Sequence, residues 1–420
     1  MKIETCDVLV VGAGPAGLAS AVSARKAGAS RVLMVERDRH IGGILQQCIH
    51  AGFGLQYFGQ ELTGPEYAEE FSSLAENAGV EILLDTTALE IREDILVCVN
   101  KDGILHIHFG ALVLAMGCRE KTRANLVIPG SRTSGIYTAG TAQKMMNIYG
   151  HCVGREVVIL GSGDIGMIMA RRLTLQGAKV KAVVELLPYL AGLPRNKVQC
   201  LDDFDIPLLL SHTIIDISGV DRVNAVTVAP VDKEKQPLKE QAWEIPCDTL
   251  LLSVGLIPEN ELTKTAGIAL SALTRGAEVD QYRQTDVPGI FACGNVLHVN
   301  DLVDNVTRES EIAGRSAALY VQGKLPRSKT ISVIPGEGVR YVCPQRIVPN
   351  ETEDVTLFFR TTAPGRNTVL SAVSENRTVA KKTSPATSPG TMEQLTLPAS
   401  AIKDLTKPVS IQARHEEGPA

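Results

Sequence analysis

Two stretches of the chain repeat one pattern of apolar residues and glycines. "VLVVGAGPAG" covers residues 8–17 and "VVILGSGDIG" covers residues 157–166, so each is a short apolar run followed by G-x-G-x-x-G. An apolar run that ends in glycines predicts a buried strand and a tight turn, and each motif leads into an amphipathic helix. Each copy then continues to a second apolar run, "RVLMVE" or "KVKAVVE", which ends in a glutamate. The pattern predicts two strand–helix–strand units of the Rossmann type, each with a site for one dinucleotide.

The two units correspond residue by residue, and in both the glutamate lies 24 positions after the first glycine. The first glycine allows the tight turn, the second lets the backbone approach a pyrophosphate, and the third lets helix and strand pack closely. The glutamate can accept hydrogen bonds from a ribose diol, and Glu185 would also repel a 2′-phosphate, so the second site should prefer NAD over NADP. Glycine turns without a ligand, and a solvated carboxylate at Glu185, are the alternatives. The corresponding residues are Gly12 and Gly161, Gly14 and Gly163, Gly17 and Gly166, and Glu36 and Glu185.

Alternation of apolar and polar residues predicts further strands. Before residue 120 it occurs in "VEILLDTTALEI", "ILVCVN" and "ILHIHF", and near the second motif in "AVTVAPV" and "DTLLLSV". After Lys324, Pro, Ser and Thr become frequent and short alternating runs follow, such as "VTLFFRTT", "TVLSAVS", "EQLTLPA" and "PVSIQA". This last region is predicted to be a small all-β domain, with the final dozen residues disordered.

Composition and charge exclude several classes of protein. The chain has 420 residues, 44% of them hydrophobic, and a net charge of −5 with both signs mixed along its length. Neither nucleic acid nor an anionic membrane is an expected partner of such a chain. The early apolar stretch lacks the order of regions in a signal peptide, and no run of roughly twenty apolar residues predicts a transmembrane segment. We therefore expect a cytoplasmic protein.

Four further stretches, together with the two motifs, carry a resemblance to a known family. They are "VERDRHIGG" (35–43), "LVLAMGCRE" (112–120), "LLSVGLIPEN" (251–260) and "VPGIFACGNV" (287–296). Residues 5–325 thus resemble the two-dinucleotide-binding flavoproteins, the pyridine nucleotide-disulfide oxidoreductase-like proteins that include thioredoxin reductase and subunits of amine and opine oxidases. The resemblance implies an α/β fold with two Rossmann-like domains, an NAD domain inserted into an FAD domain, plus the small all-β domain. The implied segments are residues 1–120 (FAD), 121–252 (NAD), 253–330 (FAD) and 331–420 (β-rich).

The resemblance also implies which residues bind each cofactor. Asn295 departs from the family, which usually has aspartate there; asparagine still forms hydrogen bonds but carries no charge, so FAD binding should survive. The implied FAD residues are Gly12, Gly14, Pro15, Ala16, Gly17, Glu36, Arg37, Gly42, Gly43, Gly117, Gly294 and Asn295. The implied NAD residues are Gly161, Gly163, Asp164, Ile165, Gly166, Glu185 and Gly255.

The cysteines argue against the best-known activity of the family. The chain has nine scattered cysteines and no C-x-x-C pair, and "GGILQQCIHAG" contains only Cys48. Disulfide reduction needs a dithiol beside the flavin, so we expect an NAD(H)/FAD-dependent oxidoreductase that is not a disulfide reductase. Cys48 and His50 are the candidate catalytic residues near the flavin, and no metal is expected. Alternatively they are a buried cysteine and a hydrogen-bonded histidine that shape a loop. The neighbouring aromatic residues Phe53, Tyr57 and Phe58 could form a substrate lid, a partner surface or ordinary core.

The patterns "GGILQQCIHAGFG" and "ACGNVLHVNDLVDNV" resemble a group of NAD/FAD-dependent oxidoreductases usually encoded beside a glycerol-3-phosphate-dehydrogenase-like flavoprotein and a small cysteine-rich protein. This implies electron transfer between NAD(H), FAD and a partner dehydrogenase subunit in an oligomer or hetero-complex. Glycerol 3-phosphate is the first candidate substrate, and the small cysteine-rich protein would carry electrons. One alternative is the flavoprotein subunit of an amine- or opine-type oxidase with a vestigial NAD site. Another is a non-catalytic scaffold whose β-rich domain docks a partner.

Overall fold

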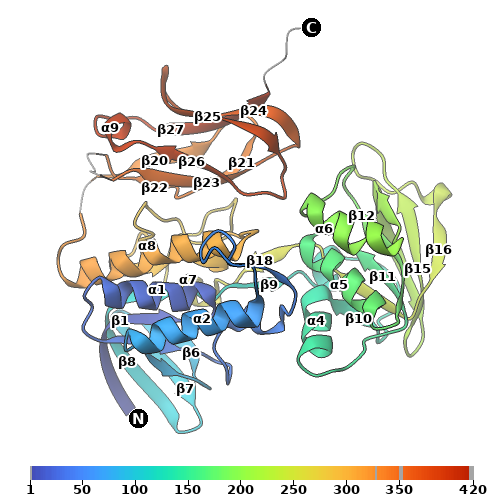
Figure 1. Cartoon of the computed structure of the whole chain (residues 1–420), viewed down its shortest axis with the longest axis horizontal. Helices are drawn as coiled ribbons and strands as arrows, with labels where there is room; N and C mark the ends of the chain where they lie inside the picture. Colours follow the sequence, from blue (N-terminus) through green and yellow to red (C-terminus); the bar gives the residue numbers. More distant parts are fainter. Residues whose placement is uncertain (1, 327–328, 350–352, 416–420) are drawn as a thin grey trace. The chain divides into compact units, whose positions relative to one another are not determined.

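A computed structural model describes residues 2–326, 329–349 and 353–415 of the chain. The chain divides into two compact units, one formed by residues 1–118 and 258–420 and the other by residues 119–257. Each unit has a sheet with helices packed on it, which is mixed with a parallel core in the first unit and parallel in the second (Figure 1). The predicted α/β fold with two Rossmann-like sheets is therefore confirmed.

Strand β8 is at the centre of the sheet of the first unit, and it is long enough to pair with two strands on the same edge. Residues 103–108 of β8 pair antiparallel with β7, and residues 112–114 pair parallel with β19. On its other edge β8 pairs parallel with β1, which continues the sheet to β2 and β5. The strands are β5 (Glu81–Leu83), β2 (Val32–Val35), β1 (Lys2–Val11), β8 (Gly103–Leu114), β7 (Ile95–Asn100), β6 (Thr87–Arg92) and β19 (Ile290–Ala292).

The last four residues of strand β1, 8–11, are buried on both faces of the sheet, since successive side chains point to opposite sides. Val8 and Val10 pack in the apolar cluster of the helices α1 (Pro15–Lys26), α2 (Gly64–Asn77) and α8 (Val303–Val321). Leu9 and Val11 belong to the cluster on the opposite side. This explains why the strand is a continuous apolar run and not an alternating one.

Helices α1 and α8 lie side by side (Figure 1). Small residues allow this approach, since a Cβ atom at Gly314 would lie 1.9 Å from the carbonyl oxygen of Ser20. The Ser23 hydroxyl also donates a hydrogen bond to the Glu311 carbonyl oxygen at 2.8 Å. The smaller elements of this unit are η1 (Gly43–Gln47), β3 (Ala51–Phe53), β4 (Leu62–Thr63), α7 (Glu261–Thr265) and η4 (Gly294–Val296).

The second unit, green to yellow in Figure 1, contains a five-stranded parallel sheet and a three-stranded antiparallel one. The parallel strands are β10 (Ile136–Thr138), β17 (Thr249–Leu252), β11 (Glu156–Leu160), β12 (Lys179–Glu185) and β13 (Leu208–Leu210). The antiparallel strands are β14 (His212–Gly219), β15 (Val223–Pro230) and β16 (Trp243–Pro246). The helices are α3 (Arg123–Leu126), α4 (Ala139–Asn147), α5 (Asp164–Leu175), α6 (Pro194–Cys200), η2 (Asp202–Phe204) and η3 (Lys239–Gln241), and the linking strands are β9 (Cys118–Glu120) and β18 (Leu256–Pro258).

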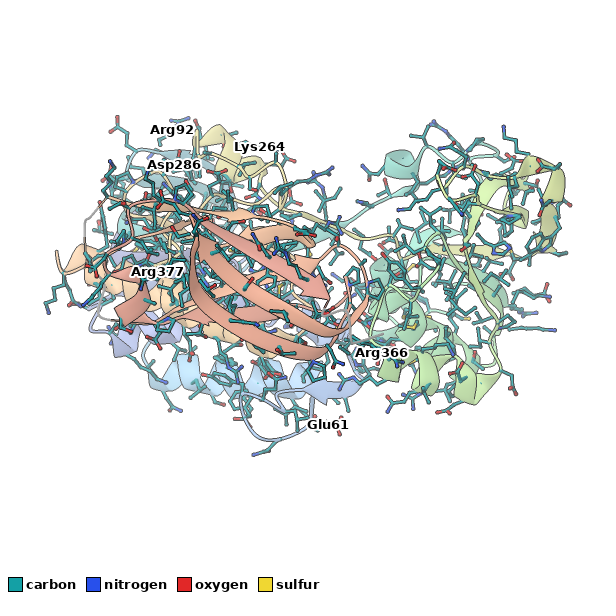
Figure 2. All side chains as sticks on the ribbon, turned by 90° about the horizontal axis from the view of Figure 1, so that it is seen from above. Glu61, Arg92, Lys264, Asp286, Arg366 and Arg377 are labelled. Atoms are coloured by element: carbon teal, nitrogen blue, oxygen red, sulfur yellow. The ribbon has the colours of Figure 1, made fainter. Side chains whose placement is uncertain are left out.

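The C-terminal β-rich region has two sheets that bury apolar side chains together, including Leu357 and Ile411. Charged side chains such as Arg366 and Arg377 project from its strands (Figure 2). One sheet is β22 (Arg346–Ile347), β20 (Ile331–Pro335), β27 (Val409–His415), β24 (Gly365–Ser374) and β25 (Arg377–Thr387). The other is β21 (Val339–Cys343), β23 (Val355–Thr361) and β26 (Glu393–Leu397), and a short helix α9 (Ala399–Ile402) accompanies them.

Strand β27 corrects the expected disorder of the last dozen residues. Residues 409–415 pair with β20 and β24 because Val409 and Ile411 are buried between the sheets. Residues 416–420 lie outside the described part of the chain. The β-rich region falls within the first compact unit, and its definition as a separate domain stays a prediction.

In the described ranges, no helix is both long enough and apolar enough to cross a membrane.

Candidate functional site

The first G-x-G-x-x-G motif forms the turn between β1 and α1. Gly12 has φ +100°, and a Cβ atom there would lie 2.6 Å from the carbonyl oxygen of Ala115. A Cβ atom at Gly17 would lie 1.7 Å from the carbonyl oxygen of Gly12. A side chain at either position would therefore collide with the protein's own backbone, so both glycines are required by the fold.

Gly14 is different, because the protein itself leaves space beside it. The nearest heavy atom to a Cβ atom at Gly14 would be Gly43 Cα, at 4.0 Å. Gly14 is the N-cap of α1, which begins at Pro15, and no side chain caps this helix end. The uncapped amide groups of the first turn thus face an open space, as an anion-binding turn requires.

Glycines also close the opposite side of this space. The Gly42 amide donates a hydrogen bond to the Ala13 carbonyl oxygen at 2.7 Å, and a Cβ atom at Gly43 would lie 3.1 Å from Gly14 Cα. Both Gly42 and Gly43 have positive φ. Two stretches of bare backbone thus form a cradle that a side chain would fill.

Glu36, at the end of β2, is tied to the same turn. One carboxylate oxygen, Oε2, accepts a hydrogen bond from the Ala13 amide at 2.7 Å, and Oε1 accepts one from the Asp38 amide at 2.8 Å. The residue is 9% exposed. Because a carboxylate has about four lone-pair positions, two remain for a ligand such as a ribose diol.

The second motif repeats this geometry. Glu185 Oε2 accepts hydrogen bonds from the Ser162 amide at 2.9 Å and from the Ser162 hydroxyl at 2.7 Å. Glu185 Oε1 accepts one from the Leu187 amide at 2.8 Å, and the residue is 5% exposed. In both units the glutamate therefore binds the amide that follows the first glycine and the amide two residues after itself. The Ser162 hydroxyl has no counterpart in the first unit.

The glycines of the second motif show the same division of roles. Cβ atoms at Gly161 and Gly166 would lie 2.1 Å and 2.7 Å from the carbonyl oxygens of Ser253 and Gly161. Gly163, the N-cap of α5, has only Ser253 atoms nearby, at 3.5 Å or more. The position that should face a pyrophosphate is again the one that the protein leaves open.

Asp164, in the first turn of α5, holds the loop after β12 against the second motif. Its Oδ1 atom accepts hydrogen bonds from the Leu193 amide at 2.8 Å and from the Asn196 side-chain amide at 2.7 Å. The Ala191 amide in the same loop donates to the Ser162 hydroxyl at 3.0 Å. Sequence reasoning placed Asp164 at the NAD site but missed Ser162 and this loop.

The remaining glycines of the predicted sites mark where the chain leaves and re-enters the first unit. Gly117 has φ +72°, and its carbonyl oxygen accepts a hydrogen bond from the Glu259 amide at 3.0 Å. Gly255 has φ +103°, and its carbonyl oxygen accepts one from the Lys121 amide at 3.0 Å. Both positions favour glycine for their backbone conformation, and their contact with cofactor stays a prediction. The same holds for three other predicted residues: Ala16 is buried in α1, Ile165 packs in the apolar cluster of α5, and Arg37 is exposed after Glu36.

The late motif lies directly on the start of α1. Gly294 has φ +74°, and a Cβ atom there would lie 2.6 Å from Ala16 Cβ. The side chain of Asn295 accepts a hydrogen bond from the Asn300 amide at 2.9 Å and donates one to Cys118 Sγ at 3.7 Å. An aspartate could not make the second of these bonds, which gives a local reason for asparagine at this position.

Cys48 and His50 are placed in the loop after η1. The Cys48 thiol donates to the Ile44 carbonyl oxygen at 3.3 Å, and burial raises the pKa of this thiol to about 12. His50 Nδ1 lies 3.0 Å from the Ala51 carbonyl oxygen, and its ring centroid is 5.1 Å from that of Phe53. These local contacts are compatible with the loop-shaping interpretation, and a catalytic role of both residues stays a prediction.

The aromatic residues near this loop, Phe53, Tyr57 and Phe58, are partly buried and pack against the core. Tyr57 and Phe58 pack against Tyr67 and Phe71, both of which are fully buried. The Tyr57 hydroxyl also donates to Glu311 on α8 at 2.6 Å. Among the three interpretations of these aromatic residues, ordinary core is the one that the packing supports.

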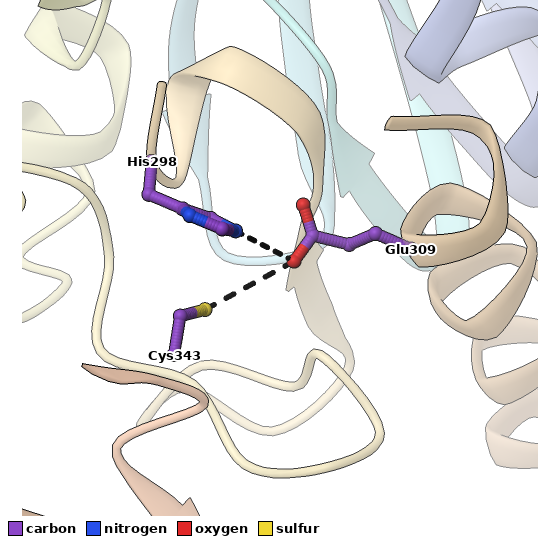
Figure 3. Close-up of side chains that lie close together, drawn as sticks. All are labelled: His298, Glu309 and Cys343. Carbon is purple, nitrogen blue, oxygen red and sulfur yellow. Dashed lines mark hydrogen bonds and ion pairs between the residues drawn. The ribbon is translucent and has the colours of Figure 1, made fainter. Parts of the chain in front are cut away.

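Sequence reasoning missed a buried ionic cluster behind the late motif. Glu309 on α8 accepts hydrogen bonds from Arg283 Nε at 3.1 Å and from the Gly294 amide at 3.2 Å. Figure 3 shows its contact with His298, whose Nε2 atom lies 3.0 Å from the carboxylate. All three side chains of the cluster are 1% exposed. The available signal was a glutamate on the apolar face of an amphipathic helix, which suggests a buried partner.

The residues present fit two dinucleotides. Each unit has an uncapped helix N-terminus, a glycine position open to a ligand and a buried carboxylate with spare acceptor capacity. These are the groups that bind the pyrophosphate and the ribose of a dinucleotide.

Comparisons with known proteins agree with this geometry. The sequence profile described as pyridine nucleotide-disulphide oxidoreductase matches residues 6–317. The chain is 26% identical to hydrogen cyanide synthase subunit HcnB of Pseudomonas aeruginosa over 336 residues, 74% of this chain and 70% of that protein. It is 27% identical to an opine oxidase subunit of Agrobacterium tumefaciens over 338 residues, 74% of this chain and 64% of that protein. Its fold is similar to that of thioredoxin reductase of T. acidophilum, with a TM-score of 0.62, 23% identity, and coverage of 76% of this chain and 99% of the other.

Proposed function

Because this chain belongs to the pyridine nucleotide-disulphide oxidoreductase family, we propose that it exchanges hydride between NAD(H) and FAD and passes electrons to or from a partner subunit. Membership makes the chain an oxidoreductase, and the cofactors of the family are FAD and NAD(P)H.

One observation carries the proposal, namely that both motifs have the same arrangement of glycine turn, uncapped helix N-terminus and buried glutamate. In each unit the glutamate is buried and bonded to the turn amide next to the first glycine, at 2.7 Å in the first unit and 2.9 Å in the second. Each carboxylate also keeps acceptor positions that the chain itself does not use, two on Glu36 and one on Glu185. Burying a polar group costs free energy unless it is hydrogen-bonded, so a ligand hydroxyl at these positions would stabilise both sites. The two intact sites therefore favour a protein that uses two nucleotides.

FAD is assigned to the first unit and NAD to the second. The first unit has the additional backbone cradle of Gly42 and Gly43 and the late motif at Gly294, which suit the longer cofactor. In the second unit Glu185 supports a preference for NADH, because its carboxylate would repel the 2′-phosphate of NADPH.

When bound, the flavin and the nicotinamide supply the hydride chemistry themselves. The chain's own residues bind and orient: the turns at Gly14 and Gly163 take the pyrophosphates, and Glu36 and Glu185 hold the riboses. Burial of both carboxylates keeps bulk water from competing for these hydrogen bonds.

Disulfide reduction is not part of the proposal. The chain has no C-x-x-C pair, and "GGILQQCIHAG" supplies only one thiol. The pKa of about 12 keeps the Cys48 thiol protonated at neutral pH, whereas thiol exchange requires the thiolate.

The partner subunit is proposed from the relatives. HcnB and the opine oxidase relative are each named as one subunit of a larger enzyme. Glycerol 3-phosphate, which a sequence pattern suggested, finds no support among the relatives named above and stays a prediction. The same relatives favour a second candidate function, a flavoprotein subunit of an opine-type oxidase whose NAD site is unused.

Anaerobic stopped-flow absorbance distinguishes these two functions. The FAD-loaded protein is mixed with NADH or, separately, with NADPH, and bleaching of the flavin band near ~450 nm is followed. Fast bleaching with NADH and slower bleaching with NADPH are expected. If neither nucleotide bleaches a protein that has bound FAD, the hydride-exchange function is wrong and the oxidase-subunit function takes its place.

A further inference from the structure

The buried cluster of Arg283, His298 and Glu309 joins three parts of the first unit. Arg283 precedes β19, His298 follows the late motif, and Glu309 lies on α8. One carboxylate oxygen of Glu309, Oε1, accepts a hydrogen bond from Arg283 Nε and contacts His298 Nε2. The other oxygen, Oε2, accepts a hydrogen bond from the Gly294 amide. The carboxylate thus holds the glycine whose left-handed backbone places the late motif against α1.

The C-terminal β-rich region encloses this cluster from its outer side. The Tyr341 hydroxyl on β21 lies 3.4 Å from His298 Nδ1, and Cys343 Sγ lies 4.0 Å from Glu309 Oε1 (Figure 3). The guanidinium of Arg283 lies 5.8 Å from the ring centroid of Phe358 on β23, a cation–π contact. Each of these side chains is less than 9% exposed, so the region excludes water from the charges.

The same region also holds the segment that follows the late motif. Arg360 donates to the Val299 carbonyl oxygen at 3.1 Å, and the Met392 amide donates to Asp301 Oδ2 at 2.9 Å. The Gln394 side-chain amide donates to Asn305 Oδ1 at 2.8 Å. Residues 299–305, which lead into α8, are therefore held by side chains and backbone from the C-terminal strands.

We propose that Glu309 is a positioning residue that couples FAD binding at Gly294 to the folding of the C-terminal β-rich region. This inference rests on the proposed FAD site. Under this proposal the C-terminal β-rich region supports the FAD site, and is not a separate module that docks a partner.

A metal site is the competing interpretation of the same residues. His298, Glu309 and Cys343 bring three ligand-type atoms within 4.8 Å of one another. However, Arg283 Nε donates to the carboxylate oxygen that a metal would need, and its guanidinium would repel a divalent cation. The neighbours of Glu309 also hold its pKa below the usual range despite burial, chiefly through His298 and Arg283. These contacts suit a hydrogen-bonded ionic network.

The test is hydrogen–deuterium exchange of the full-length protein with and without FAD. By linkage, a ligand at 100 times its dissociation constant slows exchange up to about 100-fold at amides that open only when the site opens. We expect FAD to slow exchange in β21 and β23 of the wild-type protein. Glu309→Gln should weaken FAD binding by about tenfold or more, as loss of a charge-assisted hydrogen bond does, and should abolish the slowing.

Two further variants make the test specific. Arg315→Gln, on the same helix, removes a surface ion pair to Glu353 and should change neither measurement. Tyr341→Phe removes only the hydroxyl beside His298, and should reduce the slowing in β21 even if Glu309→Gln fails to fold.

The outcomes separate this inference from the proposed function. A wild-type protein that binds no FAD would overturn both. FAD binding with no slowing in β21 and β23, or a Glu309→Gln protein with an FAD affinity within about twofold of wild type, would overturn the coupling alone. One equivalent of metal in the wild-type protein, lost in Glu309→Gln, would replace the network with a metal site.

Discussion

Replacing Glu185 by Gln should reduce the preference for NADH without removing the second site. The carboxylate accepts three hydrogen bonds, two from Ser162 and one from the Leu187 amide. Of about four lone-pair positions, one remains, on Oε1, for a ribose hydroxyl. A hydrogen bond to a charged acceptor contributes about 1.5–3 kcal/mol and one to a neutral acceptor about 0.5–1.5 kcal/mol, so the difference is about 1–1.5 kcal/mol, or roughly tenfold in affinity.

The substitution should act on the two nucleotides in opposite directions. NADH loses the charged acceptor, while NADPH is freed from repulsion between the carboxylate and its 2′-phosphate. We therefore expect the ratio of kcat/KM for NADH to that for NADPH to fall by about tenfold or more. The glutamine amide would also face at least one buried donor, so the free energy of unfolding should decrease by about 1–3 kcal/mol.

The assay is steady-state oxidation of both nucleotides with an artificial acceptor, together with a thermal melt. The chain supplies a matched control, because Glu36 has the same position in the first motif and the same bond to the turn amide. Glu36→Gln should weaken FAD binding and leave the nucleotide ratio unchanged. A folded Glu185→Gln protein with an unchanged ratio would refute the role of Glu185.

The open space beside two glycines and the burial of two cysteine thiols give further predictions. In Gly14→Ala and Gly163→Ala the added Cβ atom meets no protein atom closer than 3.5 Å, so each variant should keep the melting temperature of the wild type. Gly14→Ala should bind FAD, and Gly163→Ala should bind NADH, at least about tenfold more weakly. Titration of each cofactor against each variant checks this, and equal loss of both cofactors in one variant would contradict it. Cys48→Ser should retain flavin reduction by NADH, and the native thiol should react slowly with iodoacetamide at pH 7.5, since burial raises its pKa to about 12. Burial also raises the pKa of the Cys98 thiol to about 12, whereas a thiol in the unfolded chain has a pKa of ~8.5. The folded state therefore keeps a proton that the unfolded state loses, and the free energy of unfolding should fall by up to about 1.4 kcal/mol per pH unit as pH rises from ~9 to 12. Urea unfolding between pH 7.5 and 10.5 measures the loss, and Cys98→Val should make the slope shallower.

The two motifs could be predicted from the sequence because their geometry is local. Strand, turn and helix follow one another directly, from Lys2 to Lys26 in the first motif, and the glycines lie where two backbone segments approach closely. The predicted glutamates proved to be bonded to their own turns, at Ala13 and Ser162. The strands of the C-terminal region could be predicted for the same reason, since alternation is a property of each strand alone.

The prediction of disorder after residue 408 failed because pairing is not local. β27 is ordered by β24, whose residues lie about forty positions earlier in the chain. Cys48 and His50 were ambiguous for a similar reason, since proximity in sequence to glycines that are predicted to lie beside the flavin does not determine where a side chain points. The thiol turns to the backbone of its own loop, at Ile44.

The sequence alone determined the class of this protein, namely two Rossmann-type units with a glycine motif each and no C-x-x-C pair. Each motif lies within one short segment, because the turn between its strand and its helix requires glycine at fixed positions. Only the tertiary structure determined what surrounds the late motif. His298 and Tyr341, 43 residues apart, and Tyr57 and Glu311, 254 residues apart, come together through packing that no local pattern records. A buried charge is stable only when distant segments supply its partners, and so the role of Glu309 becomes visible only in the folded chain.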